Sequence, residues 1–289
     1  MRIVLAELAP VPREPTRNVE RIEQVARASA ADLVVFPELF LSGYRIGDAF
    51  HRLALPRRAL GSSEVARVAR EAGRAILFGA PLRSEARPGE VENAAVLARA
   101  DGSVAVQVKR YLPTYGPFEE GSLFTPTDVS VPAALGGASV GLEICYDAFF
   151  PEVSRELALA GAVILVVLSA APVTSRRLFE KVLPARAVEN ALPLVYVNRV
   201  GVEDGTVFGG GSAVWDARGE LVPLASVSVD GLHEGESVQA AELDLTDAPR
   251  WRPFRPVLRD RATRPAAPAP RAAPRPWGSA HPSTRTSDL

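Results

Sequence analysis

Residues 139–152 have the sequence SVGLEICYDAFFPE, from Ser139 to Glu152. Apolar residues at every second position from 140 to 144 predict a β-strand with one buried face. Pro151 and Gly161 then occupy the positions expected at the first turn of a helix and just past its end. Cys145 therefore lies where a strand gives way to a helix, a turn at which backbone N–H groups are free.

The thiol of Cys145 has two possible roles. It is the only cysteine among the 289 residues. Free cysteine is among the most buried residue types, where it acts as a small hydrophobic side chain. At the end of a strand it can instead serve as a nucleophile. Position alone favours the buried role, so the choice depends on the rest of the chain.

The composition is that of a globular protein with a substantial core, because 47% of the residues are hydrophobic and 23% are charged. The length fits one large α/β domain. A net charge of −1 gives no general attraction to nucleic acid or to an anionic membrane. The single cysteine excludes an internal disulfide framework, and no Cys/His cluster has metal-ligand spacing. No apolar run has the length of a signal peptide or a membrane span, so we expect a cytoplasmic protein.

Strands and helices alternate along the chain, as in α/β folds. The first helix is expected to be capped by Thr16 or Asn18 and the second by Ser62 or Ser63, and Pro184 should break or bend a later helix. The expected strands are residues 3–8, 32–36, 75–80, 93–99, 104–109, 140–144, 162–168, 192–199, 212–215, 220–225 and 238–245, and the expected helices end near residues 26, 73, 161 and 191.

Two segments in the second half are defined by small residues or proline. Residues 209–211 are three glycines without the lysine and helix of a phosphate loop, so we expect backbone packed closely against a neighbour. Residues 217–219 are expected to form a hairpin turn. From 249 to 289 the chain is rich in proline, alanine and arginine and should be an extended or disordered tail.

Three ionisable residues each follow a predicted strand. Glu38, Lys109 and Cys145 all stand at such positions, and strand ends commonly converge on one edge of an α/β sheet. A carboxylate there can accept the thiol proton, and an ammonium can favour the thiolate and stabilise an oxyanion. Each residue alone is more often an ordinary surface or core group, so their coincidence carries the hypothesis of nucleophilic catalysis.

The motifs around these residues resemble those of the nitrilase superfamily of carbon–nitrogen hydrolases, in the same order and spacing. The resemblance covers roughly residues 1 to 248 and rests on several motifs together rather than on any one of them. They are Phe36-Pro37-Glu38-Leu39 with Ser42-Gly43-Tyr44, Lys109-Arg110-Tyr111-Leu112-Pro113, residues 115–120, residues 145–152, residues 184–190, residues 196–201 and residues 208–212.

The resemblance implies a four-layer α-β-β-α sandwich over residues 1–248, assembled as a homodimer or larger, that needs no metal or organic cofactor. Glu38 would be the general base, Lys109 the oxyanion-stabilising lysine and Cys145 the nucleophile. Glu120 would orient the lysine and the substrate. The backbone N–H of Tyr146 would complete the oxyanion site.

The branch of the family is indicated by the residues after Cys145. Tyr146-Asp147 is typical of amidase-like members, which implies a small primary amide as substrate. Glutaminase domains of NAD synthetases share similar motifs, so an ammonia supplier to a partner synthetase is an alternative, and a non-catalytic scaffold is another. Tyr44 and Tyr115 either line the substrate pocket or pack at its rim.

Two departures from the family pattern bear on the pocket and on subunit packing. Ser169 stands where an asparagine is common, and Gly209 where an aspartate often precedes two glycines. The histidines His51, His233 and His281 have no placing that suggests a partner for the thiol, so a cysteine–histidine enzyme is not favoured.

Overall fold

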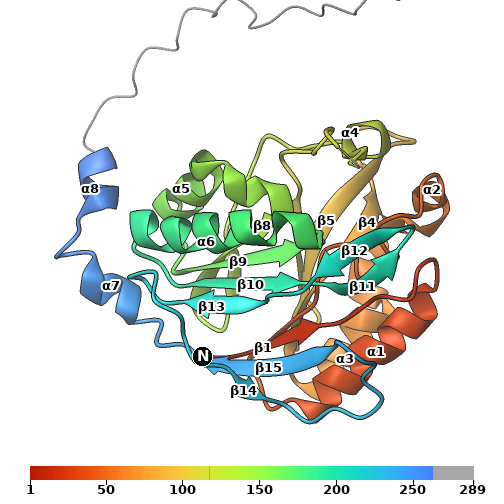
Figure 1. Ribbon diagram of the computed structural model, residues 1–289, viewed down its shortest axis with the longest axis horizontal. Helices are drawn as coiled ribbons and strands as arrows, with labels where there is room; N and C mark the ends of the chain where they lie inside the picture. Colours follow the sequence, from red (N-terminus) through yellow and green to blue (C-terminus); the bar gives the residue numbers. More distant parts are fainter. Residues whose placement is uncertain (117, 263–289) are drawn as a thin grey trace, which may run out of the picture.

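Two β-sheets lie against each other in the computed structural model, which describes residues 1–116 and 118–262 (Figure 1). The first sheet has the strand order β14-β15-β1-β2-β4-β5-β6, with β3 paired to β4. Its strands are β1 (Arg2–Glu7), β2 (Leu33–Val35), β3 (Leu55–Pro56), β4 (Ala75–Arg83), β5 (Val91–Ala98), β6 (Val104–Val108), β14 (Ala225–Ser226) and β15 (Ser237–Glu242).

The second sheet has the order β13-β10-β9-β8-β7, with β8, β9 and β10 parallel to one another. A separate hairpin is formed by two further strands. The bounds are β7 (Ala133–Leu135), β8 (Ala138–Ile144), β9 (Ile164–Ser169), β10 (Leu194–Asn198), β13 (Ala213–Trp215), and, for the hairpin, β11 (Val200–Glu203) and β12 (Thr206–Gly209).

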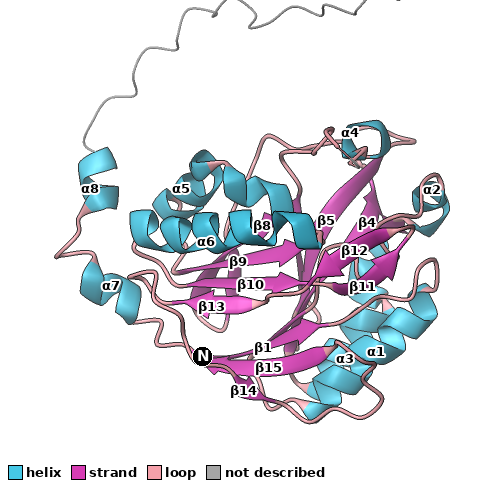
Figure 2. Cartoon of the chain, in the orientation of Figure 1, coloured by secondary structure: helices cyan, strands magenta, loops and turns pink. Residues whose placement is uncertain are grey.

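Helices cover the outer faces of both sheets (Figure 2). α1 and α3 pack together on the first sheet, and α5 and α6 pack on the second. The α-helices are α1 (Pro15–Ala28), α2 (Ala49–Leu53), α3 (Glu64–Ala72), α4 (Glu120–Leu123), α5 (Pro151–Leu159), α6 (Arg176–Asn190), α7 (Asp247–Trp251) and α8 (Val257–Ala262), and the 3-10 helices are η1 (Arg57–Ser62), η2 (Cys145–Phe149) and η3 (Val173–Ser175). None of the helices in the described part of the chain is long and apolar enough to span a bilayer.

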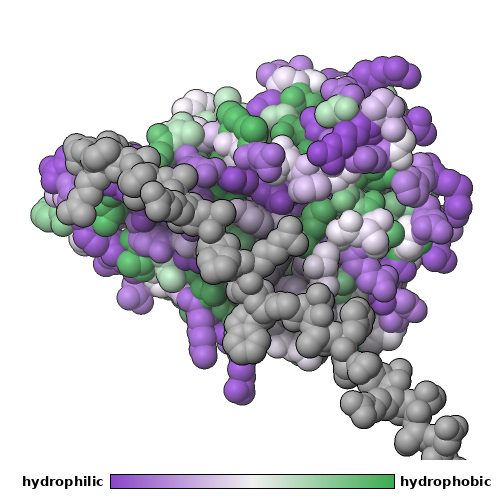
Figure 3. Space-filling view, turned by 90° about the horizontal axis from the view of Figure 1, so that it is seen from above, coloured by the Kyte–Doolittle hydropathy of each residue, from purple (hydrophilic) through white to green (hydrophobic). Residues whose placement is uncertain are grey.

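Strand β1 shows why four layers form. Its residues are hydrophobic on both sides, and successive side chains of a strand point to opposite faces. Ile3 and Leu5 belong to the core between the two sheets, whereas Val4 and Ala6 belong to the core under α1 and α3. The predicted α-β-β-α sandwich is therefore confirmed. Figure 3 shows hydrophilic and hydrophobic residues interspersed over the face seen from above.

One of the two predicted N-terminal helix caps is confirmed and the other is wrong. Ser63 caps α3, because its side chain accepts from Ala66 N and Gly73 ends the helix with φ +64°. The cap predicted for α1 at Thr16 or Asn18 is wrong, because that helix begins at Pro15. The buried amide of Asn18 instead bonds the backbone of residues 11 and 41, a tertiary contact that no local pattern reveals.

Three features of the second half differ from expectation or refine it. Helix α6 runs unbroken through Pro184. The predicted strand 220–225 is wrong, because only an isolated bridge from Trp215 to Leu221 and the two-residue strand β14 form there. The three glycines of 209–211 do pack closely, since a Cβ at Gly210 would lie 2.4 Å from a carboxylate oxygen of Glu7.

The predicted tail begins with ordered structure. α7 and α8 occupy residues 247–251 and 257–262, where an extended or disordered chain was expected. Arg252 and Arg255 donate to the carbonyls of Ala162 and Ala217, and α8 lies against α5 and α6. These contacts with the folded core explain the helices. The remaining part of that prediction, residues 263–289, lies outside the described residues.

A buried carboxyl group lies between β8 and α5. Glu143 has 0% of its surface exposed; Ser154 Oγ donates to its Oε1 at 2.7 Å. Its Oε2 has no hydrogen-bond partner within residues 1–116 and 118–262. Burial raises the pKa of Glu143 from 4.5 to about 7, although the Ser154 hydrogen bond opposes the change.

We predict that Glu143→Gln changes the pH dependence of stability. Between the unfolded and folded pKa values the unfolded chain releases this proton while the folded chain keeps it, so Glu143 lowers stability as pH rises through that window. Relative to wild type, the free energy of unfolding of the variant should increase by about 3 kcal/mol from about pH 4 to about pH 8, measured by urea titration.

The matched control is Glu152→Gln, on the exposed face of α5. Its difference from wild type should be nearly the same at both pH values. The same pH-independent result for Glu143→Gln would show that burial of this carboxyl does not control its proton.

Candidate active site

The ends of three strands deliver the predicted residues to one place. Glu38 follows β2 and Lys109 directly follows β6, both in the first sheet. Cys145 directly follows β8 in the second sheet. Because β2, β4 and β6 run in the same direction, their carboxyl ends lie at one edge of the first sheet, opposite the end of β8.

Lys109 is the centre of a buried charge cluster. Its Nζ lies 2.6 Å from Glu38 Oε1 and 2.7 Å from Glu120 Oε1. All three residues are at most 2% exposed. Tyr44 OH donates to Glu120 Oε1 at 2.5 Å, and Asn93 Nδ2 donates to Glu38 Oε1 at 2.7 Å. The lysine and both carboxylates are therefore fixed in position by hydrogen bonds.

The charges in this cluster determine the protonation states. Burial opposes the charged form of Lys109, but the carboxylates of Glu120 and Glu38 outweigh it and hold the pKa of the lysine above its ordinary value. Burial raises the pKa of Glu120 to about 7, with Lys109 opposing the change. The lysine thus stays an ammonium, and its charge is shared by two carboxyl groups.

Cys145 lies opposite this cluster in a constrained conformation. Its φ of +48° is in the left-handed region, which costs a non-glycine residue about 1–2 kcal/mol. The residue keeps only 8% of its surface exposed, so it is enclosed by its neighbours. Burial raises the pKa of the thiol well above its ordinary value, and Glu38 adds to the effect while Lys109 and Ser169 oppose it. The resting group is therefore a protonated thiol.

Asp147 holds the turn after Cys145 against the segment after Lys109. Its carboxylate accepts from the backbone N–H groups of Ile144, Arg110 and Tyr111 at 3.2, 3.1 and 2.9 Å. Burial raises the pKa of Asp147 to about 6, with Lys109 opposing the change. One side chain thus joins the ends of strands from different sheets.

Aromatic side chains pack against one another in series near the thiol. Tyr44 is 8% exposed and contacts Glu120, whereas Tyr115 is 53% exposed. Tyr44 therefore lies inside the site and Tyr115 at its rim. The rings form consecutive pairs with centroids 4.9 to 6.5 Å apart: Tyr44–Phe118, Phe118–Tyr115, Tyr115–Tyr146, Tyr146–Phe149, Phe149–Phe179 and Phe179–Tyr196.

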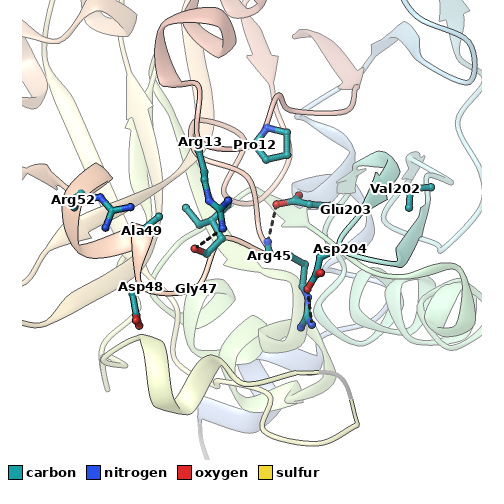
Figure 4. A pocket seen from close by; sticks show the side chains of 11 residues that line it. Pro12, Arg13, Arg45, Gly47, Asp48, Ala49, Arg52, Val202, Glu203 and Asp204 are labelled. Atoms are coloured by element: carbon teal, nitrogen blue, oxygen red, sulfur yellow. Dashed lines mark hydrogen bonds and ion pairs between the residues drawn. The ribbon is translucent and has the colours of Figure 1, made fainter.

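An open cleft is lined by Arg45, the residue after Tyr44 in the chain (Figure 4). The cleft has a volume of about 690 Å³, and Arg45 in its wall is bonded to Glu203 and Asp204. A smaller cavity of about 120 Å³ shares Arg45 and Asp204 with the cleft and is also lined by Tyr44 and Glu120. The cleft is lined by Pro12, Arg13, Arg45, Ile46, Gly47, Asp48, Ala49, Arg52, Val202, Glu203 and Asp204.

Several functional contacts were not predicted from the sequence. Asn93 is a buried amide within an apolar strand, and that polar residue among hydrophobic neighbours was the available signal. Ala170 N donates to Glu38 Oε2 at 2.9 Å, a contact without any side-chain signal. His51 and His233 are exposed, as expected, and His281 lies outside the described residues. Within the described ranges no group of three His, Cys, Asp or Glu side chains could hold a metal ion.

Sequence comparisons give relatives over most of the chain. A family model described as carbon–nitrogen hydrolase matches residues 3–253. The chain is 33% identical to an (R)-stereoselective amidase of Pseudomonas sp., over 86% of this chain and 88% of the amidase. It is 35% identical to a protein of Pseudomonas protegens named hydrolase in pqqF 5'region, over 78% of this chain and 79% of that protein.

A glutamine-dependent NAD(+) synthetase of Rhodobacter capsulatus is 34% identical over 76% of this chain. The matched region covers only 40% of the length of that synthetase.

Solved structures agree with the sequence comparisons. A carbon–nitrogen hydrolase from Helicobacter pylori G27 superposes with a TM-score of 0.78 at 26% identity, covering 90% of this chain and 94% of that one. An amidase from Nesterenkonia sp. AN1, solved as a cysteine-to-alanine variant in complex with butyramide, gives a TM-score of 0.72 at 30% identity, covering 88% and 95%. Another variant of that amidase shows Michael addition of acrylamide at the active-site cysteine, with a TM-score of 0.71 at 30% identity, covering 88% and 97%.

Gly79 in β4 allows the Glu38 turn to reach its position. A Cβ at Gly79 would lie 2.1 Å from Leu39 N and 2.6 Å from the Cα of Glu38. The backbone of Gly79 also donates to Pro37 O at 3.1 Å and accepts from Leu41 N at 3.1 Å. A side chain at this position would therefore push the carboxylate turn away from the sheet.

We predict that Gly79→Ala lowers the free energy of unfolding by about 2 kcal/mol or more, because the added atom meets backbone that cannot move independently. Urea denaturation measures the change. Gly61→Ala is the matched control, since a Cβ there would meet its nearest neighbour, Gly102 O, at an ordinary 3.7 Å. Equal midpoints for the two variants would contradict the close approach.

Proposed function

This chain belongs to the carbon–nitrogen hydrolase family, and on that premise we propose that it hydrolyses a small primary amide to a carboxylic acid and ammonia. It is a hydrolase that acts on carbon–nitrogen bonds. The proposal rests on one observation above all. A buried ammonium, that of Lys109, is held between the carboxylates of Glu38 and Glu120 beside the single thiol of Cys145.

In the proposed acylation step Glu38 accepts the thiol proton and Cys145 Sγ attacks the amide carbon. The carbonyl oxygen gains negative charge, which Lys109 Nζ and the backbone N–H of Tyr146 stabilise. Glu38 then gives its proton to the leaving nitrogen, and the C–N bond breaks. The products are a thioester on Cys145 and free ammonia.

In the proposed deacylation step Glu38 acts as a base for the second time. It takes a proton from water, whose oxygen attacks the thioester carbon. The same two donors stabilise the second oxyanion. Collapse of this intermediate breaks the C–S bond, releases the carboxylic acid and returns the proton to sulfur. Glu120 keeps Lys109 charged and oriented throughout.

Amides are the favoured substrates for two reasons. The amidase from Nesterenkonia sp. AN1 has been solved with butyramide, and the relative from Pseudomonas sp. carries the name amidase. Tyr146-Asp147 after the nucleophile is also the amidase-like pattern. The ammonia-supplier alternative rests on likeness to synthetases of which the matched region is only 40%. A scaffold without activity would be expected to have lost one of the four groups, and all four are present.

We also propose how the protein assembles and where in the cell it acts. We expect a homodimer or larger assembly that acts in the cytoplasm on a small-molecule amide, with residues 1–248 as the hydrolase domain. We expect neither nucleic acid nor a membrane to be a partner of the protein.

We predict that Cys145→Ala abolishes amide hydrolysis, because no other thiol exists in the chain. Ammonia release from a primary amide measures activity, and thermal unfolding checks that the fold is intact. Lys109→Met should be inactive as well, whereas Lys181→Met, at the other lysine and on the exposed surface of α6, should retain wild-type turnover. Unchanged turnover in Cys145→Ala would falsify the assignment of the nucleophile.

We further predict that primary amides react faster than the nitriles with the same acyl group. Ammonia release should be compared across matched pairs of short aliphatic amides and nitriles, with glutamine and asparagine included. A preference for nitriles would overturn the amidase assignment. A marked preference for glutamine would favour the ammonia-supplier alternative.

A further inference from the structure

The sulfur of Cys145 has a second set of polar neighbours, which the proposed reaction does not use. Ser169 is the last residue of β9, and Tyr196 lies in β10. Ser169 Oγ lies 3.3 Å from Cys145 Sγ, and Tyr196 OH lies 3.2 Å from Ser169 Oγ. The three side chains therefore form a chain of hydrogen bonds across three adjacent parallel strands, β8, β9 and β10.

The direction of this chain is fixed once the sulfur is a thiolate, because a thiolate has no proton and can only accept. A serine hydroxyl has one proton to donate and can accept from another group. Tyr196 is 3% exposed, and its OH donates to Ser169 Oγ. The proton of Ser169 is then directed to Cys145 Sγ. Hydrogen bonds arranged in series strengthen one another in a buried site.

Packing keeps Tyr196 in place. Its ring stacks on Phe179, with centroids 5.2 Å apart and an angle of 26° between the planes. Ser169 is 0% exposed, and its carbonyl accepts from Glu38 N at 3.4 Å. The backbone of Ser169 is thus bonded to the Glu38 turn, and its hydroxyl lies between Tyr196 OH and the sulfur.

We propose that Ser169 is a positioning residue that holds the Cys145 sulfur and stabilises its thiolate, and that Tyr196 orients Ser169 for this purpose. The proposal rests on Cys145 being the nucleophile of the proposed function. It adds a donor from the second sheet to the base and ammonium supplied by the first.

The electrostatic surroundings explain why such a donor matters. The thiol faces two buried carboxylates, which disfavour a negative charge on sulfur, and one ammonium, which favours it. The Ser169 hydrogen bond opposes the rise in the pKa of the thiol caused by burial and by Glu38. The titratable groups that interact with the thiol are Glu38, Lys109, Glu120, Tyr44, Tyr115 and Tyr196.

The test measures thiol reactivity without any substrate. Because the chain has one cysteine, alkylation by bromoacetone, a small neutral reagent without an amide group, reports on Cys145 alone when the label on sulfur is quantified. Ser169→Ala should slow alkylation by about three- to tenfold near neutral pH and move its pH profile to higher pH, since a hydrogen bond to an ionised group is lost. Ser169→Thr, which keeps the hydroxyl, should restore most of the rate.

Tyr196→Phe tests the second link. It keeps the ring and removes the hydroxyl, so it should slow alkylation in the same direction by a smaller factor. Combined with Ser169→Ala it should have no further effect, because the two residues act in series. Ser154→Ala, which removes the buried hydroxyl bonded to Glu143, is the matched control and should leave the rate unchanged.

The outcomes separate this proposal from the proposed function. An alkylation rate in Ser169→Ala equal to that of wild type would overturn it. It would also be overturned if Tyr196→Phe slowed alkylation by the same factor in the Ser169→Ala background as in the wild-type protein. If Ser169→Ala fails to fold, Tyr196→Phe alone decides, since an unchanged rate and pH profile there would overturn the chain of hydrogen bonds. Because no amide is present, these results stand whether or not the protein hydrolyses amides.

Discussion

The site depends on the ion pairs that the buried ammonium of Lys109 forms with two carboxylates. An unpaired charge with no exposed surface would cost several kcal/mol, so the lysine requires the carboxylates of Glu38 and Glu120 at 2.6 and 2.7 Å. The requirement is mutual, since either carboxylate without the lysine would also be a buried, unpaired charge. Tyr44 and Asn93 supply further donors to the two acids. The paired arrangement of the three groups is therefore a condition for burying any one of them in its charged form.

Two sheets must meet for this cluster to act on the thiol. The first sheet carries the acid and the lysine, and the second carries Cys145. Asp147 joins them, because its carboxylate binds backbone N–H groups on both sides of the junction. Gly79 acts within the first sheet, where the absence of a side chain leaves room for the turn that bears Glu38. The hydrogen bonds of Asp147 and the missing side chain of Gly79 thus help the strands to set the geometry of the site.

Local pattern was sufficient to predict an α/β fold and the residues at the strand ends, whereas the four layers were implied by the resemblance to the nitrilase superfamily. Apolar runs locate strands, and the position just after a strand is read directly from the chain, as for Lys109 and Cys145. The contact of Asn93 with Glu38 joins β5 to the turn after β2, so spacing along the chain carries no trace of it. The same reason accounts for the misplaced first helix cap, where Asn18 serves the neighbouring loops instead.

In the proposed reaction the charges of the site decide how a thiol with a raised pKa loses its proton. Ionising Cys145 by loss of its proton to water would add a negative charge next to two buried carboxylates. Transfer of the proton from sulfur to Glu38 leaves the total charge of the site unchanged, so its cost is only the difference between two buried positions. Donors that face the sulfur, among them the ammonium of Lys109 and the hydroxyl of Ser169, reduce that difference. The enclosed site therefore keeps the thiol protonated at rest, and the proposed transfer to Glu38 forms the thiolate without changing the net charge of the site.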